Sequence, residues 1–264
     1  MNKTSPFSNK VSVVIRNKNQ KPSLSFLLEN LNRRYSEDIE EIIVLDNASV
    51  DGSQTIVSRF GAKLININDF GYGSSANRGA EAATSSIVVI FSAHAYPVSH
   101  DFFKLIIEEF RQTDNLAGLR CLHNHNDYKN YILNISAEDD TRQSGLIFCG
   151  SAFNREVWKK IPFNSEIVTM EDKEWSLRVL HGGYQIKFVP AIFCYHITRT
   201  RNQKFIRYKN ETYGSYRLWG ERFNLMNVLN GFFMRFYRLF QNTTLEAFYI
   251  VKTFVFQLKF LIKK

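Results

Sequence analysis

The sequence has few cysteines, no apolar leader and no repeat, and each absence argues against a class of protein. Its three cysteines, Cys121, Cys149 and Cys194, form neither a CxxC pair nor an even set. We therefore expect a reducing, cytosolic compartment rather than a disulfide framework or a zinc site. The first ten residues, MNKTSPFSNK, lack the apolar core of a signal peptide. No internal repeat or low-complexity segment is found.

What the chain does contain is aromatic residues and an uneven charge. The chain has 264 residues, which is enough for a well-buried core. Its aromatic content of 14% argues against a disordered protein. The formal net charge is +9, but 13 of the 34 basic residues and only three of the 25 acidic ones lie from Arg199 onward. A body of net charge −1 thus precedes a basic, aromatic tail of +10, and such a body is not typical of nucleic-acid binding.

Short β-branched runs alternate with helical segments along the first half of the chain. Strands are predicted at 11–15, 42–45, 63–67 and 87–91, and helices at 23–31, 54–60, 76–83 and 101–110. This order predicts an α/β fold whose mostly parallel, Rossmann-like sheet carries helices on both faces. After Leu116 the alternation weakens, with strands expected at 144–153 and 185–189 and helices at 155–161 and 173–181. We place the halves of this domain at about 1–98 and 99–200, and a helical tail at 201–264.

The most informative stretch is 42–53, IIVLDNASVDGS, in which a buried strand ends at Asp46-Asn47. In open α/β sheets, ligands bind beyond the carboxyl ends of parallel strands, and an Asp there accepts hydrogen bonds from a base or ribose. An ordinary strand, turn and helix, with Asp51 and Ser53 as capping residues, explains those two well. It explains Asp46 poorly.

Three further loops follow strands at the same edge of the predicted sheet, and the first of them, residues 16–20, comes after the first strand. Gly71 and Gly73 allow close approach of a ligand to the backbone before a helix N-terminus that favours an anion, although such glycines also serve helix packing. Ser92-Ala93-His94 follows the fourth strand. His94 is interpreted either as a ligand of a divalent cation or as an ordinary hydrogen-bonded loop residue.

Three ionisable residues in the second half have two interpretations each. Glu171 and Asp172 stand at a helix entry, where they are helix caps or dipole partners, or Asp172 is a general base. The motif alone favours the cap. His196, after a second apolar run, is either a satisfied histidine or a second metal ligand.

Seven ordered motifs together resemble family-2 glycosyltransferases, chiefly the rhamnosyltransferase-like members that build bacterial surface polysaccharides. They are VSVVIRNKN, IIVLDNASVDGS, GYGSSANRG, SAHAYP, GSAFNREVW, MEDKEW and YHITR, and they cover roughly residues 11–199. Seven motifs in one order make a chance match improbable, whereas any one would be weak.

The resemblance implies a GT-A fold and inverting transfer of a sugar from a nucleotide-sugar to a hydroxyl group. By position it implies that Asp172, with Glu171 beside it, is the catalytic base. The implied nucleotide-sugar contacts are Ile15, Arg16, Asn17, Asp46, Asn47, Gly71, Gly73, Asn77, Arg78, Ser92 and Ala93. His94 and His196 are the implied ligands of a divalent cation, Mn2+ or Mg2+.

Two positions depart from the family's pattern. Ser92-Ala93-His94 stands where the family has Asp-x-Asp, so both carboxylates are absent and His94 takes the place of the second one. Either His94 and His196 bind the metal, or basic groups such as Arg78 or Arg199 neutralise the diphosphate, or activity is lost. Arg16 also replaces a proline that is common after the first strand.

The tail, Arg201–Lys264, lies outside the resemblance. Lys252, Lys259 and Lys263 share one helix face among aromatic and aliphatic residues, and Arg235 and Arg238 recur likewise. No uninterrupted run reaches the roughly 18 apolar residues of a membrane-spanning helix. The pattern favours an interfacial helix on anionic phospholipid over helices that pack on the body or on a second subunit of a homo-oligomer.

From these observations we expect a cytoplasmic enzyme, peripherally bound to the inner face of the cell membrane. Its expected donor is a UDP- or dTDP-sugar, and its expected acceptor is a glycan or glycolipid in capsule or O-antigen synthesis. A catalytically weak, nucleotide-binding scaffold is the alternative. Nucleic-acid binding through the tail ranks last, and it would require tight, salt-sensitive oligonucleotide binding.

Overall fold

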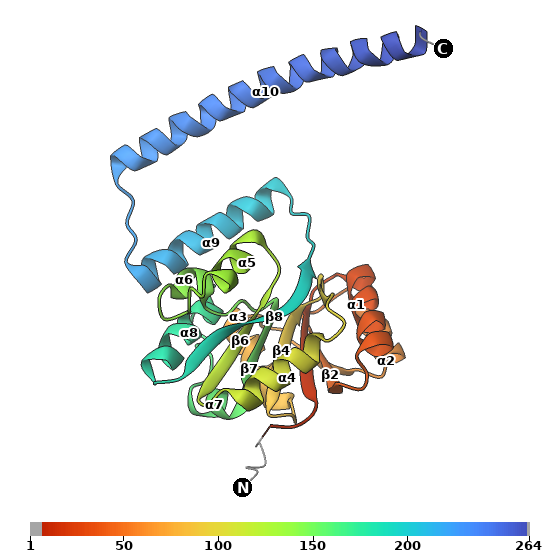
Figure 1. Cartoon of the computed structure of the whole chain (residues 1–264), viewed down its shortest axis with the longest axis vertical. Helices are drawn as coiled ribbons and strands as arrows, with labels where there is room; N and C mark the ends of the chain where they lie inside the picture. The colour runs from red at the N-terminus through yellow and green to blue at the C-terminus, as the bar shows by residue number, and fades with distance from the viewer. Residues whose placement is uncertain (1–6, 263–264) are drawn as a thin grey trace. The chain divides into compact units, whose positions relative to one another are not determined.

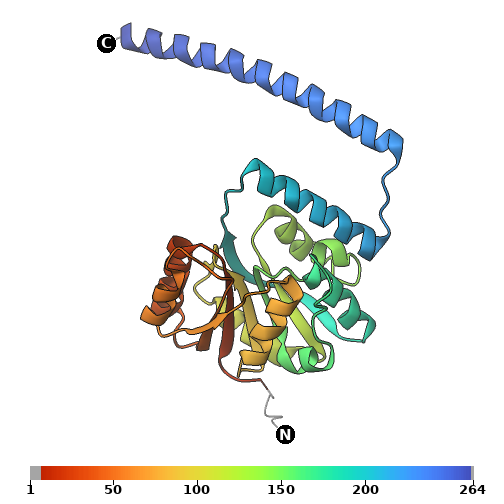
Figure 2. The same cartoon turned by 180° about the vertical axis from the view of Figure 1, so that it is seen from behind.

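The computed structural model describes residues 7–262, which form two compact units, the first ending at Gly214 and the second beginning at Ser215 (Figures 1 and 2). The first unit is an α/β body. Its strands are β1 (Val11–Asn17), β2 (Ile39–Asp46), β3 (Lys63–Asn66), β4 (Ile87–Ser92), β5 (Ala95–Pro97), β6 (Leu116–Leu122), β7 (Gly150–Asn154) and β8 (Gln185–Tyr195). Its helices up to β8 are α1 (Lys21–Arg34), α2 (Ser53–Arg59), α3 (Tyr72–Ala82), α4 (Phe102–Gln112), α5 (His125–Ile132), α6 (Thr141–Ser144), α7 (Arg155–Lys160) and α8 (Glu171–His181).

The eight strands form one sheet in the order β3-β2-β1-β4-β7-β6-β8-β5. The first half, β3 to β4, is parallel throughout. In the second half β7 runs antiparallel to both β4 and β6, β6 and β8 are parallel, and β5 is antiparallel to β8. The predicted α/β fold with a mostly parallel sheet is confirmed.

Helices cover both faces of the sheet because each contributes one apolar face to a separate core. On one face, α1, α2 and α4 pack through residues such as Leu27, Val57 and Phe103. On the other face, α3, α7 and α8 pack through residues such as Ala80 and Trp175. The two layers hold the strand ends at one edge in fixed positions.

Several boundaries differ from those predicted by sequence. The strands β5 and β6 were not predicted. Of the residues expected to be strand, Ser144 ends α6 and residues 145–149 lie between α6 and β7. The capping residue of α2 is Gly52 at φ 81° rather than Ser53. Asp51 instead accepts hydrogen bonds from Ser53 N at 3.0 Å and Lys21 N at 2.7 Å, so it joins α2 to α1.

Helices α9 (Arg201–Trp219) and α10 (Leu225–Ile262) follow the sheet. The first begins where the charge of the sequence changes, and the first compact unit continues along it to Gly214. The 38 residues of α10 expose aromatic and aliphatic side chains all along the helix, including Phe232, Phe240 and Phe256. None of the helices within residues 7–262 has an apolar stretch of the length and hydropathy needed to cross a membrane.

Candidate functional site at the carboxyl edge of the sheet

Parallel pairing brings the ends of three strands together at one edge of the sheet. In the register of β1 and β2, Asn17 lies beside Asp46, and in that of β1 and β4, Arg16 lies beside Ser92. The buried β-branched residues upstream fix these ends, because every strand here is packed on both faces. The predicted convergence of Arg16, Asp46 and the segment after β4 is therefore present.

Asp46 is fully buried and is held as a carboxylate by three hydrogen bonds. Its Oδ1 accepts from Asn17 Nδ2 at 2.7 Å, and its Oδ2 accepts from Ser49 N at 3.0 Å and Gln54 Nε2 at 3.2 Å. Burial raises the pKa of Asp46, but the hydrogen bonds from Ser49, Asn17 and Gln54 outweigh it and lower the pKa below its usual value. Asp46 therefore holds Asn17, Ser49 and Gln54 in place around the end of β2.

Asn17 carries an unused acceptor at this edge. Its Nδ2 donates to Asp46 and to Ser49 Oγ, yet its buried Oδ1 has no hydrogen-bond partner. Of the described residues, only Asn17, Ser85 and His94 leave a buried side-chain polar atom unpaired. A buried unpaired acceptor costs about 1–3 kcal/mol, and a ligand that donates to it recovers that cost.

Arg16 links the end of β1 to the start of α8. Its Nη1 lies 3.0 Å from Glu171 Oε1, its Nη2 donates to Phe148 O at 2.6 Å, and its guanidinium lies 5.4 Å from the centre of the Tyr72 ring. Burial and the neighbouring Asp172 charge raise the pKa of Glu171 to about 7, although Arg16 acts in the opposite direction. Glu171 is therefore a buried partner of Arg16.

Asp172 lies in the first turn of α8, after Met170 at a left-handed φ of 64°. Its Oδ2 accepts a hydrogen bond from Phe148 N at 3.1 Å, and its Oδ1 accepts one from Lys173 N at 2.8 Å. Neither Glu171 nor Asp172 caps α8, because the capping position is Met170 and no side chain caps the helix. The half-buried Asp172 carboxylate is thus oriented by the backbone of the 145–149 segment.

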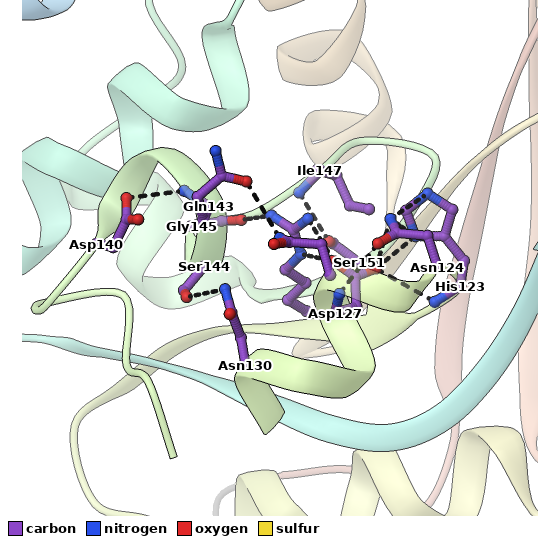
Figure 3. A network of polar contacts seen from close by, with 12 residues as sticks. His123, Asn124, Asp127, Asn130, Asp140, Gln143, Ser144, Gly145, Ile147 and Ser151 are labelled. Atoms are coloured by element: carbon purple, nitrogen blue, oxygen red, sulfur yellow. Dashed lines mark hydrogen bonds and ion pairs between the residues drawn. The ribbon is translucent and has the colours of Figure 1, made fainter. Parts of the chain in front are cut away.

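That segment is itself held by a buried polar network (Figure 3). Gly145 O accepts from Arg120 Nη1 at 2.5 Å and from Lys173 Nζ at 2.6 Å. Arg120 Nη2 also lies 2.6 Å from Asp127 Oδ1, and His123 Nδ1 lies 2.6 Å from Asp127 Oδ2. Burial raises the pKa of Asp127, but the His123 hydrogen bond and the Arg120 charge hold it below its usual value.

His94 lies at the end of β4, between the two halves of the sheet. Its Nδ1 lies 3.1 Å from Gln20 Oε1, its ring packs edge-on against Tyr195 at 4.9 Å, and its buried Nε2 has no partner. Burial, with the positive charges of Arg199 and Arg16, lowers the pKa of His94 to about 4. The imidazole is therefore neutral at physiological pH.

These residues do not fit a divalent cation. Mn2+ and Mg2+ prefer several oxygen donors, and residues 7–262 contain no group of three or more His, Cys, Asp or Glu placed to hold a metal ion. The His196 backbone N–H donates to His94 O at 3.1 Å, but the His196 side chain is exposed. Arg16 and Arg199 add positive charge at His94, which opposes a cation.

The glycine-rich loop and α3 are used in packing. A Cβ on Gly73 would overlap the Asn164 carbonyl oxygen, so only glycine allows this approach. Asn77 Nδ2 donates to Phe163 O at 2.8 Å, and its Oδ1 accepts from Trp158 Nε1 at 2.8 Å and from Phe163 N at 2.9 Å. These contacts engage both ends of the Asn77 amide and tie α3 to the 162–165 segment.

The other predicted site residues lie on or near the same edge. Ile15 is fully buried in the core, Asn47 N donates to Asn17 O at 2.9 Å, and Ala93 N donates to Arg16 O at 3.0 Å. Ser92 is half-buried at the end of β4, and Gly71 is the capping residue of α3. Arg78 is exposed on α3, and its side chain has no hydrogen bond or ion pair with the rest of the described chain.

Comparison with known proteins identifies the family of this chain. The sequence profile described as Glycosyl transferase family 2 matches residues 12–176, from the first strand to α8. This chain belongs to glycosyl transferase family 2.

A curated relative in Methanococcus voltae is 26% identical over 253 residues, covering 84% of this chain and 77% of the relative. Its name is dolichyl N-acetyl-alpha-D-glucosaminyl phosphate 3-beta-D-2,3-diacetamido-2,3-dideoxy-beta-D-glucuronosyltransferase. An uncharacterized glycosyltransferase of Mycobacterium bovis is 32% identical over 110 residues, which is 42% of this chain and 48% of that protein.

Solved structures of two glycosyltransferases show the same GT-A fold. The mannosyltransferase PcManGT from Pyrobaculum calidifontis, in complex with GDP-Man and Mn2+, has a TM-score of 0.61 at 19% identity, covering 78% of this chain and 64% of that one. Glucosyl-3-phosphoglycerate synthase from Mycobacterium tuberculosis, with Mn2+, UDP and glucosyl-3-phosphoglycerate, has a TM-score of 0.59 at 14% identity, covering 77% of each chain.

Sequence reasoning on this family-2 chain missed the residues that act through their backbone or that join distant segments. Phe148 contributes a carbonyl to Arg16 and an amide to Asp172. Tyr195 packs against His94 and accepts a hydrogen bond from Arg199 Nη2 at 2.6 Å. The motif YHITR contains Tyr195 and Arg199, but nothing in its spacing shows that the two side chains bond to each other.

Proposed function

We propose that this protein transfers a glycosyl group from a nucleotide-sugar to a hydroxyl of a lipid-linked saccharide, with inversion at the anomeric carbon. Family membership supports glycosyl transfer. The relative in Methanococcus voltae is described by name as acting on a dolichyl-linked sugar phosphate, which supports a lipid-linked acceptor. A hexosyl or deoxyhexosyl group, and a place in the synthesis of capsule, O-antigen or another surface polysaccharide, belong to this proposal.

The observation that carries the proposal is the position of Asp172. Its carboxylate is oriented by Phe148 N and is only partly buried, whereas the adjacent Glu171 is buried against Arg16. Two neighbouring carboxylates thus have different surroundings, and only Asp172 is placed to receive a proton from a substrate. Glu171 and Arg16 act as positioning residues for the first turn of α8.

In the proposed reaction, Asp172 accepts the proton of the acceptor hydroxyl as its oxygen attacks the anomeric carbon. A new carbon–oxygen bond forms there while the bond to the diphosphate breaks on the opposite side. The nucleoside diphosphate leaves with that electron pair. This in-line displacement inverts the configuration of the anomeric carbon.

The carboxyl edge of β1 and β2 is the proposed site of the base and ribose. Asp46 holds Asn17 and Ser49 in place, and the unpaired Asn17 Oδ1 is an acceptor for a base N–H or a ribose hydroxyl. Asn47 and the residues of the 71–78 segment border this edge. UDP- and dTDP-sugars remain the proposed donors.

Helix α10 supplies the proposed contact with the membrane surface. It exposes aromatic and aliphatic side chains over its length, and Lys252 and Lys259 lie seven positions apart on one face. Lysines beside an apolar helix surface suit anionic lipid headgroups. Lys263, expected on the same face, lies outside the described residues.

The decisive experiment is sugar transfer by the Asp172→Asn variant, assayed with a panel of UDP-, GDP- and dTDP-sugars. We expect a loss of about 10²–10⁴-fold in the transfer rate, which is typical of removing a general base, with nucleotide binding unchanged. Asp114→Asn, an exposed carboxylate outside the site, is the matched control. A fully active Asp172→Asn enzyme would rule out this role.

The absent Asp-x-Asp pair supports a second candidate, a nucleotide-binding scaffold without turnover. The same assay separates the two, because turnover of any donor by the unaltered chain excludes a purely structural role.

A further inference from the structure

A basic pocket lies between the segment after β8 and the first turns of α9. Its volume is about 360 Å³, and it is lined by Ile197, Thr198, Arg199, Lys204, Arg207, Tyr208 and Glu211. Three of these residues are cationic and one is acidic. None of Lys204, Arg207 and Glu211 was a candidate in the sequence, because they lie beyond the family's motifs.

The charges in the pocket are only partly neutralised. Arg207 Nε lies 2.6 Å from Glu211 Oε1, which pairs those two residues. Neither Arg199 nor Lys204 has an ion pair with any carboxylate among residues 7–262. Two cations without acidic partners in one concave site attract an anion, and their guanidinium and ammonium groups suit phosphate oxygens.

The pocket connects with the candidate donor site through Tyr195. Arg199 Nη2 donates to Tyr195 OH at 2.6 Å, and the Arg199 guanidinium carbon lies 5.8 Å from the centre of the Tyr195 ring. The Tyr195 ring packs against His94, whose backbone oxygen accepts a hydrogen bond from His196. His94 stands at the end of β4, where the family's metal-binding carboxylate is absent. Arg199, whose positive charge acts on His94, therefore lies close to the position where a metal ion would neutralise the donor's diphosphate.

We propose that this basic pocket binds the donor's diphosphate directly, with Arg199 and Lys204 supplying the positive charge that a carboxylate-bound metal ion would otherwise supply. The inference rests on the proposed function, because the diphosphate is that of the nucleotide-sugar. Tyr195 holds Arg199 in place through its hydroxyl and its ring. Positively charged side chains can stabilise a leaving diphosphate by the same electrostatic effect as a cation.

The test is calorimetric binding of UDP, GDP and dTDP to the full chain, in EDTA and in Mn2+, compared with the corresponding nucleosides. For the nucleoside diphosphate that binds, we expect EDTA to change the Kd less than about twofold. In the double variant Arg199→Gln/Lys204→Gln we expect the diphosphate Kd to rise at least about tenfold, or about 1.4 kcal/mol. Nucleoside binding should not change.

Lys209→Gln is the matched control, since it is exposed on α9 outside the pocket lining. Circular dichroism of each variant checks the fold. Any of three results would overturn the inference: diphosphate binding that requires Mn2+, a double variant that binds diphosphate like the unaltered chain, or no preference for any nucleoside diphosphate over its nucleoside.

Two further measurements complete the test. One distinguishes the donor's diphosphate from that of a lipid-linked acceptor, and the other distinguishes failure of this inference from failure of the proposed function. A short-chain prenyl diphosphate is titrated in parallel. If the double variant weakened only that ligand, the pocket would belong to the acceptor and the inference would be wrong. Sugar transfer in Mn2+ that EDTA abolishes would leave the proposed function standing and overturn the metal-free diphosphate site.

Discussion

Arg16 Nη1 lies 3.0 Å from Glu171 Oε1, although the two residues are 155 positions apart in the sequence. Arg16 is the last residue but one of β1, at the proposed nucleotide-binding edge, and Glu171 precedes the proposed base in α8. The pair thus fixes the proposed base relative to the end of β1. Both side chains are largely buried, with exposed fractions of 11% and 5%.

Removing one partner of this ion pair should destabilise the fold more than removing both partners. We expect Arg16→Met to destabilise the fold by about 3–5 kcal/mol, because it leaves Glu171 buried without a partner. The double variant Arg16→Met/Glu171→Met should recover much of that loss. Chemical denaturation of the single and double variants measures the coupling, and additive losses would contradict a buried ion pair.

The stability of the fold should depend on pH through Lys173. Burial, with the nearby Arg120 charge, lowers the pKa of Lys173 to about 7 from 10.5. The unfolded chain therefore holds this proton between pH 7 and about 10.5 while the folded chain does not. Relative to Lys173→Met, the unaltered chain should gain stability as the pH rises through that window, and below pH 7 the difference should be constant. Denaturation midpoints of both proteins across pH 6–10 check this, and parallel curves would contradict the assignment.

Gly73 should tolerate no side chain, for reasons of packing. In Gly73→Ala the new methyl group would overlap the Asn164 carbonyl, and we expect a loss of about 1–3 kcal/mol of stability. Glu81→Ala, at an exposed position of the same helix, is the control and should be close to neutral. Thermal denaturation measures both. A stable Gly73→Ala protein with weakened nucleotide binding would instead favour the predicted role of Gly73 beside a ligand.

Reversing two charges on α10 should weaken membrane binding. Lys252→Glu/Lys259→Glu should lose at least about 2 kcal/mol of binding to anionic vesicles, roughly 30-fold. Flotation with phosphatidylserine-containing and phosphatidylcholine vesicles measures this, with Lys209→Glu on α9 as the control. If the unaltered chain failed to float and instead formed dimers by sedimentation, the apolar surface of α10 would be a subunit contact.

The sequence predicted the parallel half of the sheet because its strands are short, β-branched and buried on both faces. It also predicted that Arg16, Asp46 and His94 converge, since parallel strands end at one edge. It did not predict β6, LAGLRCL, because glycine and arginine interrupt that apolar run. The buried Arg120 is satisfied by Asp127 and Gly145, contacts that no local pattern contains.

The roles of Glu171 and Asp172 also depend on contacts that no local sequence pattern contains. As adjacent carboxylates at a helix entry they favoured a capping interpretation, yet neither caps α8. Their partners, Arg16 and the Phe148 backbone, come from β1 and from the 145–149 segment. Only the three-dimensional arrangement distinguishes the buried Glu171 from the partly accessible Asp172.

The direction of β7 has a consequence for how this protein could diversify. Because β7 is antiparallel to β4, the residues that reach the carboxyl edge of β4 are those that precede β7, including Phe148. The 123–144 stretch before them contains α5 and α6. It ends at Gly145, whose carbonyl oxygen accepts hydrogen bonds from Arg120 and Lys173. Changes in length between α5 and α6 would leave the Asp127, Arg120 and Gly145 contacts in place. They would remodel the proposed acceptor side while the sheet register and the position of Asp172 stayed the same. Substrate choice could then change by mutation without a change in catalytic geometry.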